Sequence, residues 1–156
     1  MPVRRTSGLL STLVLVTACT TSPPMNTAER LEFYRANAGE PVPSFHSPTR
    51  LWGWRALGDS ALTVWTSKND GFLLELASRC PEMAVASAIG LTTRNDQVAA
   101  GLDSIVMQRR GSADKPATCL ISSIRPINTR AVTESKRDLH DADLLNRDPA
   151  APGEPH

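Results

Sequence analysis

The central part of the chain, residues 49–127, consists of short hydrophobic segments separated by turn residues. Residues 51–57 and 61–66 are rich in Trp, Val and Thr, and the Gly58-Asp59-Ser60 sequence between them is typical of a hairpin turn. After a second turn sequence, residues 72–77 (FLLELA) place large apolar side chains on one face of a strand. Further segments predict three strands and a short helix, at residues 89–93, 104–109, 118–124 and 81–88.

Short antiparallel strands that follow one another in a domain of this size usually close into a barrel or pack a helix across an open face. We therefore predict an α+β, mainly β domain over residues 49–130. We expect a small antiparallel barrel-like sheet of five or six short strands with one or two short helices.

A helix is predicted before this domain, over residues 26–37. Asn26 is a suitable N-cap, Glu29 completes a capping-box pattern, and Gly39 supplies a stop. Prolines then force an extended connector. Because so short a helix is not stable alone, we expect it to dock on the domain.

The C-terminal segment, residues 131–156, has no aromatic residue, more acidic than basic residues and the ending DPAAPGEPH. With so little apolar surface to bury, it is predicted to be a disordered acidic tail.

The N-terminal residues have the pattern of a bacterial export signal. Arg4 and Arg5 precede the apolar residues 9–16, a stretch too short to span a bilayer. It ends in Val16-Thr17-Ala18-Cys19, which resembles the lipobox of bacterial lipoproteins. The resemblance implies that residues 1–18 are removed and that Cys19 becomes the acylated N-terminus, carrying palmitate among its acyl chains. The alternative is a plain secretory signal with a chance cysteine.

An acylated Cys19 would anchor the chain to a membrane, because three acyl chains exceed the marginal attachment that one chain gives. Residues 20–25 (TTSPPM) form a polar tether, so residues 19–48 comprise the acylated N-terminus, the tether and the docking helix. Thr20, where Asp would favour inner-membrane retention, favours the outer membrane. We expect a lipid-anchored protein of the cell envelope that faces the periplasm.

The chain has three cysteines, and acylation of Cys19 leaves Cys80 and Cys119 as an even pair. In an oxidising compartment the two are expected to form a disulfide. A metal or redox pair lacks support, since there is no CxxC spacing and no histidine near either cysteine.

Composition and charge exclude one class of partner. The 156 residues include 17 basic and 16 acidic ones, for a net charge of +1, which argues against nucleic-acid binding. Only 4% of residues are aromatic and 12 are proline, so the part that builds a core is shorter than the whole chain.

No catalytic, cofactor or metal site can be assembled from the sequence. All three histidines lie in the connector or the tail, and the chain contains no G-x-S-x-G, P-loop or G-x-G-x-x-G motif. Glu75, inside an apolar strand, and Asp103 are the carboxylates to consider, with Arg125 as an ion-pair partner for either. A simpler interpretation is that Glu75 faces solvent on the outer side of its strand.

The three tryptophans are predicted to share a face. Alternation places Trp52 and Trp54 together, and a hairpin loop of two or four residues around Asp59 would add Trp65. This patch would form either the barrel core beneath the helix of residues 26–37, the commoner fate of large aromatics, or an exposed ligand face.

Several segments together resemble a family of small exported domains in Gram-negative bacteria, classed only as a domain of unknown function. The resemblance spans residues 29–128 and implies no known activity. It departs from the family at Phe72, where members tend to have Tyr, and at Asn128, where they tend to have an acid. It rests on Ala38-Gly39-x-Pro41-Val42, Trp54-x-x-Leu57, Val64-x-Thr66, Phe72-Leu73-Leu74-x-Leu76 before Cys80, Ala88-Ile89-Gly90-Leu91-Thr92, Ala100-Gly101-x-Asp103-x-Ile105 and Cys119-x-Ile121-x-x-Ile124-Arg125-Pro126.

Two functions fit these features. The first is a non-catalytic binding or accessory module, held at the membrane by its lipid and meeting an envelope partner that the sequence does not identify. It fits the anchor, the tether, the disulfide and the lack of a catalytic constellation. The second is an enzyme that acts on cell-envelope material through carboxylates such as Glu75 and Asp103, and it requires these groups to converge in a pocket.

Overall fold

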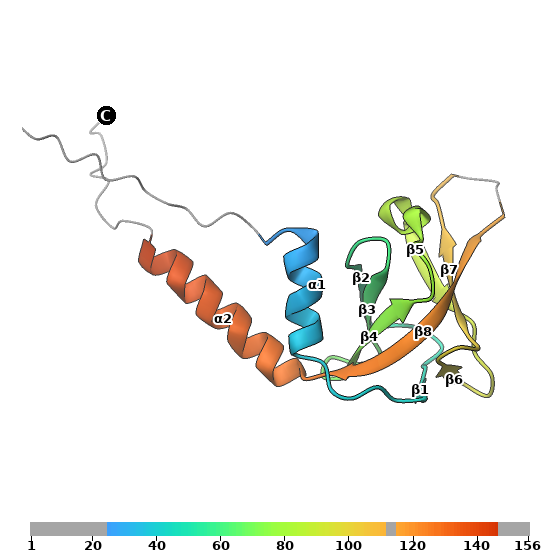
Figure 1. The fold of residues 1–156 in the computed structure, drawn as a ribbon, viewed down its shortest axis with the longest axis horizontal. Helices are drawn as coiled ribbons and strands as arrows, with labels where there is room; N and C mark the ends of the chain where they lie inside the picture. Colours follow the sequence, from blue (N-terminus) through green and yellow to red (C-terminus); the bar gives the residue numbers. More distant parts are fainter. Residues whose placement is uncertain (1–24, 112–114, 147–156) are drawn as a thin grey trace, which may run out of the picture.

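The computed structural model describes residues 25–111 and 115–146 (Figure 1). These residues form two α-helices, one 3-10 helix and eight strands. In chain order they are α1 (Thr27–Ala36), β1 (Ser44–His46), β2 (Gly53–Ala56), β3 (Ala61–Trp65), β4 (Gly71–Leu76), η1 (Pro81–Val85), β5 (Ala88–Leu91), β6 (Gln97–Ala99), β7 (Ser104–Gln108), β8 (Ala117–Ile127) and α2 (Thr129–Asn146).

Six strands form one antiparallel sheet in the order β2-β3-β4-β8-β7-β5. The long strand β8 joins its two halves, since its first residues pair with β7 and its later residues pair with β4 (Figure 1). The register of β4 and β8 shifts between Glu75 and Leu76, and such a bulge increases the bend and twist of a sheet. The curved sheet confirms the predicted α+β, mainly β barrel-like fold.

The sheet contains the expected number of strands, and the additional strands β1 and β6 form a separate antiparallel pair. Each has only three residues. Strand β1 lies in the segment that the sequence predicts as an extended connector. The proline residues around it conceal the strand pattern, so its pairing with β6 was not predicted.

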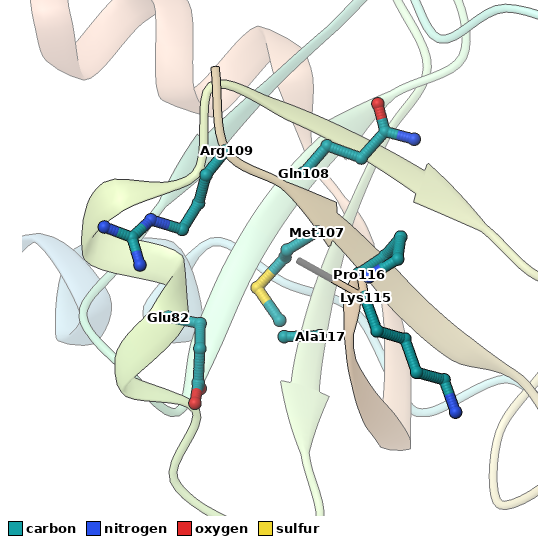
Figure 2. Close-up of a pocket in the computed structure, with 7 residues that line it drawn as sticks. All are labelled: Glu82, Met107, Gln108, Arg109, Lys115, Pro116 and Ala117. Carbon is teal, nitrogen blue, oxygen red and sulfur yellow. The ribbon is translucent and has the colours of Figure 1, made fainter. Parts of the chain in front are cut away.

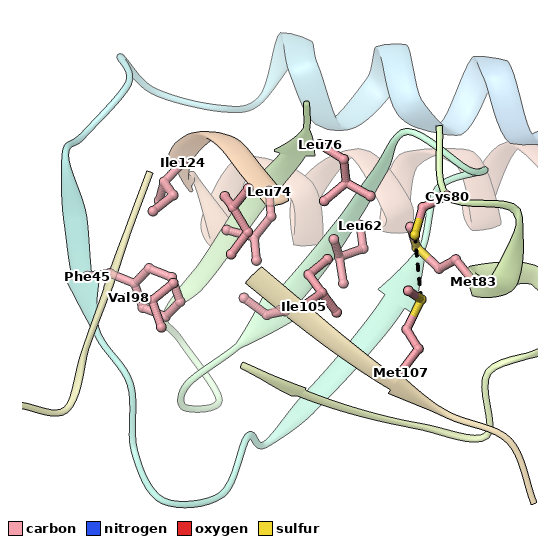
Figure 3. Packing of buried hydrophobic residues seen from close by; sticks show 12 residues of the cluster. Phe45, Leu62, Leu74, Leu76, Cys80, Met83, Val98, Ile105, Met107 and Ile124 are labelled. Carbon is pink, nitrogen blue, oxygen red and sulfur yellow. Dashed lines mark hydrogen bonds between the residues drawn. The ribbon is translucent and has the colours of Figure 1, made fainter. Parts of the chain in front are cut away.

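The main hydrophobic core fills the concave side of the sheet, as Figure 3 shows. Leu74 and Leu76 of β4 belong to it and Phe72 packs against it, as the alternation of residues 72–77 predicts. Phe45 of β1 stacks on Phe72 with ring centroids 4.3 Å apart, so the small strand pair closes one end of the core.

A second cluster lies between the outer face of the sheet and the two helices. Tyr34 of α1 and Val132 of α2 are buried there against Leu57 and Leu73. Helix α1 has the predicted capping box, with the Asn26 side chain accepting from the Glu29 backbone N–H at 2.9 Å. The helix therefore docks on the domain as expected, although it covers the outer face and not the barrel core.

Helix α2 corrects the prediction for the C-terminal segment. Residues 131–156 are predicted to be disordered, yet α2 begins at Thr129 and continues to Asn146. Residues 147–156 lie outside the described part of the chain. The helix starts at a cap, since Asn128 Oδ1 accepts the Ala131 N–H at 3.1 Å, and its first turns bury Val132. The burial partners of Val132 are distant in sequence, which is why composition alone misses this helix.

The predicted disulfide between Cys80 and Cys119 is confirmed, with the two Cα atoms 6.4 Å apart. It ties the residue before η1 to strand β8. Among the described residues, neither helix is both long and apolar enough to cross a bilayer.

Candidate functional site

The three tryptophans do not share a face, so that prediction is wrong. Trp54 packs against the main core, whereas Trp65 packs against the outer cluster beneath the helices. Trp52 joins Trp65 in the lining of an outer cavity and is 66% exposed.

Two features of the β2–β3 hairpin explain this arrangement, the length of its loop and a bulge at the start of β2. The Leu57 N–H donates to the Ala61 carbonyl oxygen, so the loop consists of Gly58, Asp59 and Ser60. A loop with an odd number of residues pairs Trp54 with Val64 and puts Trp65 on the opposite face.

The second detail is a bulge at the start of β2. Gly53 pairs with Trp65, and the Trp52 N–H also donates to the Trp65 carbonyl oxygen, so two residues oppose one. The bulge interrupts the alternation between Trp52 and Trp54. Trp52 therefore lies beside Trp65.

The carboxylates Glu75 and Asp103 do not converge with Arg125. Glu75 forms an ion pair with Arg35 of α1, with Oε1 2.7 Å from Nη2, so it does not simply face solvent. Its hydrogen bond, followed by that of Glu32, raises the pKa of Arg35 above the usual value. This pair fastens α1 to the sheet.

Asp103 is 3% exposed and has a structural role in the turn before β7. Its carboxylate accepts the Thr92 hydroxyl at 2.9 Å and the Ala99 backbone N–H at 2.8 Å. Arg125 instead donates to the carbonyl oxygens of Gly39 and Ala38, at 2.8 and 3.3 Å. Each of the three groups thus binds a different partner. They do not come together in one pocket, as the hypothesis of a carboxylate site at these residues requires.

A cavity of about 500 Å³ lies between η1 and the ends of β7 and β8, where Glu82, Arg109 and Lys115 line it (Figure 2). Glu82 also lies close to the sulfur atoms of Cys80 and Cys119. Because both sulfurs are consumed by the disulfide, this trio lacks the thiolate ligands that a metal would need. Residues 112–114, which precede Lys115 in the sequence, are outside the described part of the chain.

The most developed candidate site lies where the curved sheet fails to close. Strands β2 and β5 are the two edges of the six-stranded sheet, and both line a cavity of about 610 Å³. Residues 47–51, which lead into β2, complete its wall. We call this cavity the edge cleft. Its apolar lining includes Leu51, Trp54, Ile89 and Leu91, all partly buried and in contact with the main core.

The backbone of β5 offers hydrogen-bonding groups to the edge cleft. The Thr92 N–H donates to the Ser104 carbonyl oxygen, and Ala88 and Gly90 share its side of the strand. Because backbone groups alternate along an antiparallel strand, the N–H and C=O groups of Ile89 and Leu91 point away from β7. In the described part of the chain, no strand pairs with this edge.

The same alternation applies to β2. Leu57 and Ala61 form a hydrogen-bonded pair, so the backbone groups of Trp54 and Ala56 point away from β3. The edge cleft therefore combines apolar side chains with backbone groups of Trp54, Ile89 and Leu91 that no strand of the described residues pairs with. The sequence predicts a strand at residues 89–93 but not its edge position, which depends on the long-range order of the sheet.

Comparison with protein families identifies one match: the model of a family of unknown function, DUF6491, covers residues 2–143. The chain belongs to the DUF6491 family. No curated protein and no solved structure gives a significant match.

Membership of DUF6491 brings no activity, so the chemistry of this DUF6491 chain has to be inferred from its own site. The match extends beyond the resemblance seen over residues 29–128 and includes most of α2. Cys19, the predicted acylation site, lies outside the described residues.

Proposed function

We propose that this DUF6491 protein is a lipid-anchored lipoprotein of the cell envelope that faces the periplasm from the outer membrane. It acts as a non-catalytic binding module, and its ligand lies in the edge cleft. The observation that carries this proposal is the 610 Å³ cavity between the two free edges of an otherwise curved sheet.

The chemistry of the cleft favours an extended polypeptide segment. A strand that pairs with β5 would accept and donate hydrogen bonds at Ile89 and Leu91, whose backbone groups are directed into the cleft. Its alternate side chains would contact Trp54 and Leu51, which supply apolar surface. An unpaired strand edge is a ready template for such pairing.

Peptide binding can be tested with an array of random synthetic decapeptides as the probe. We expect the bound peptides to share alternating apolar residues. Ile89→Pro should abolish their binding, because proline removes the N–H that points into the cleft while leaving the pairing with β7 intact. Ile89→Ala, which retains the N–H but loses the side chain, should weaken binding.

The matched control is Leu120→Ala, which removes an apolar side chain that is 41% exposed on β8 and does not line the cleft. It should bind peptides as the wild type does. Equal binding by the wild type and Ile89→Pro would show that the edge of β5 does not hold the peptide.

The anchor is tested separately from the cleft. Its support is the lipobox resemblance at residues 16–19 and the polar tether that follows. Intact mass and detergent-phase partitioning should show acylated wild-type protein in the detergent phase, and unmodified Cys19→Ala protein outside it. Wild-type protein without acyl chains would exclude the lipoprotein assignment.

A further inference from the structure

A basic and aromatic groove lies between α1, α2 and the outer face of β2 and β3, which is the face of the sheet opposite the main core. It consists of two cavities of about 250 and 170 Å³ that share Tyr34, Arg55 and Lys136 in their lining. Lys68 completes the first cavity and Arg30 the second, so four cations converge there. No acidic residue is among the described residues that line it.

Within the described part of the chain, the cations of this basic groove have no acidic partner and can meet an anionic ligand. None of Arg55, Lys68 and Lys136 takes part in the ion pairs formed among described residues. Arg30 donates to the Met25 carbonyl oxygen at 3.1 Å, a neutral partner. The Lys136 ammonium lies 6.0 Å from the centroid of the Tyr34 ring, at the outer limit of a cation–π contact. Their charge is therefore not neutralised by described side chains.

The aromatic residues of the groove suit a membrane interface. Trp52 is 66% exposed, an unusual position for the largest apolar side chain, and it lies next to Trp65. Tryptophan is enriched at the level of lipid headgroups, because its ring is apolar and its N–H remains hydrogen-bonded. Basic residues beside it add attraction to anionic lipids.

The position of the groove along the chain places it near the predicted anchor. Met25, the first described residue, lines the groove. Met25 is six positions after Cys19 in the sequence, and a fully extended chain spans only about 20 Å over that distance. An acylated Cys19 would therefore hold the groove within reach of the bilayer surface.

We propose that the basic groove binds the phosphate-bearing headgroups of the anionic bilayer to which the chain is anchored. This inference rests on the lipid anchor of the proposed function. It assigns α1, α2 and Trp52 to the membrane side of the molecule. The edge cleft between β2 and β5 is a separate site for the polypeptide partner.

The exported protein can be tested in vesicles of phosphatidylcholine, or of equal parts phosphatidylcholine and phosphatidylglycerol. Both preparations contain lipids brominated near the headgroup, which quench a tryptophan at the interface. We expect stronger quenching in the phosphatidylglycerol vesicles, and Trp52→Phe should remove most of the difference. Arg55→Gln combined with Lys136→Gln should weaken docking roughly fivefold for each charge removed.

Arg94→Gln is the matched control, because Arg94 is exposed, lies in the turn before β6 and does not line the groove. It should retain the wild-type response, and the melting temperatures of all variants should agree. Equal quenching of the wild type in both vesicle types would overturn the proposal. So would a loss of docking in Arg94→Gln as large as that in the double variant. Inorganic phosphate is also added to the phosphatidylcholine vesicles. If it changes the tryptophan quenching as phosphatidylglycerol does, the groove holds free phosphate and the membrane assignment is wrong.

Flotation distinguishes failure of the anchor from failure of the groove. Wild-type protein that floats with phosphatidylcholine vesicles retains its anchor, whatever the quenching shows. If it does not float with them, the anchor is wrong. The groove is then supported by flotation with phosphatidylglycerol vesicles that the double variant loses, and is overturned by its absence.

Discussion

Single residues decide which surface each tryptophan serves. One extra residue in the hairpin loop separates Trp65 from Trp54, and one bulged residue moves Trp52 to the side of Trp65. Trp54 consequently contributes to the edge cleft, and Trp52 to the basic groove. A change of one residue in register would exchange these surfaces, because side chains alternate along a strand.

Gly71 provides the space that the Trp65 ring occupies. A Cβ atom at position 71 would lie 2.6 Å from the Cε3 and Cζ3 atoms of Trp65. We expect Gly71→Ala to displace the ring and lower the free energy of unfolding by about 1–3 kcal/mol. Urea denaturation measures the change. Gly90→Ala is the control, since a Cβ there meets no atom within 4 Å, and equal stability of the two variants would contradict the prediction.

Asp103 is expected to matter for stability. Asp103→Ala leaves the Ala99 N–H and the Thr92 hydroxyl without their acceptor, and this should lower the free energy of unfolding by about 1–3 kcal/mol. The midpoint of urea unfolding gives the value. Asp70→Ala, which removes an exposed carboxylate bonded to Ser67, should have a much smaller effect. A comparable loss in both variants would argue against a special role of the buried turn.

The two helices depend on each other and on the sheet. Helix α1 has ten residues and is too short to be stable alone, and its buried Tyr34 contacts the cluster that also holds Val132 of α2. The ion pair of Arg35 with Glu75 joins α1 to β4 as well. The basic groove exists only while both helices remain docked, since each supplies part of its lining.

Removal of α2 should therefore destabilise the domain. Truncation after Arg130 removes Val132, which is 3% exposed, and we expect a loss of about 1.5–3 kcal/mol from that side chain alone. Thermal unfolding should show a lower melting temperature than the wild type. Glu134→Ala, an exposed change on the same helix, should have little effect. An unchanged melting temperature after truncation would instead support the prediction from composition that residues 131–156 form a disordered tail.

At the scale of the whole molecule, long-range pairing holds the sheet together and leaves one opening in it. Strand β8 pairs with both β4 and β7, while β2 and β5 each pair with one strand and leave their outer edges without a partner in the described part of the chain. The molecule thus has two separate surfaces, the edge cleft and the basic groove, on different sides of one sheet. A chain whose basic groove docks on the membrane would keep the edge strands available to a partner.

The disulfide constrains this arrangement across the chain. Cys80 and Cys119 are 39 residues apart in sequence, and the chain-entropy model gives about 4 kcal/mol for a loop of that length. We expect the double variant Cys80→Ala, Cys119→Ala to be less stable by about 2–5 kcal/mol. Reductant should lower the melting temperature of the wild type and leave that of the double variant unchanged. If the wild type melts at the same temperature with and without reductant, the disulfide does not have this stabilising role.

Local signals in the sequence were sufficient for several features. The capping box of α1 involves residues three apart, and the alternating face of β4 depends on a period of two, so both can be recognised without a fold. The disulfide was predicted by counting cysteines, because Cys80 and Cys119 remain as an even pair once Cys19 is assigned to the predicted anchor, and a disulfide is the expected state of such a pair in an exported protein. These local rules predicted the fold class and most strands.

Only the tertiary structure decided the sites. Helix α2 depends on Val132 meeting Tyr34 and Leu57, residues distant in sequence that no compositional rule brings together. The faces of the tryptophans depend on loop parity and a bulge, which shift register without altering the hydrophobic pattern. The edge cleft depends on which strands lie at the edges of the sheet, and that is set by the order of the whole sheet. Each is a long-range property, because side-chain burial and strand order arise only when separate segments compete for the same partners.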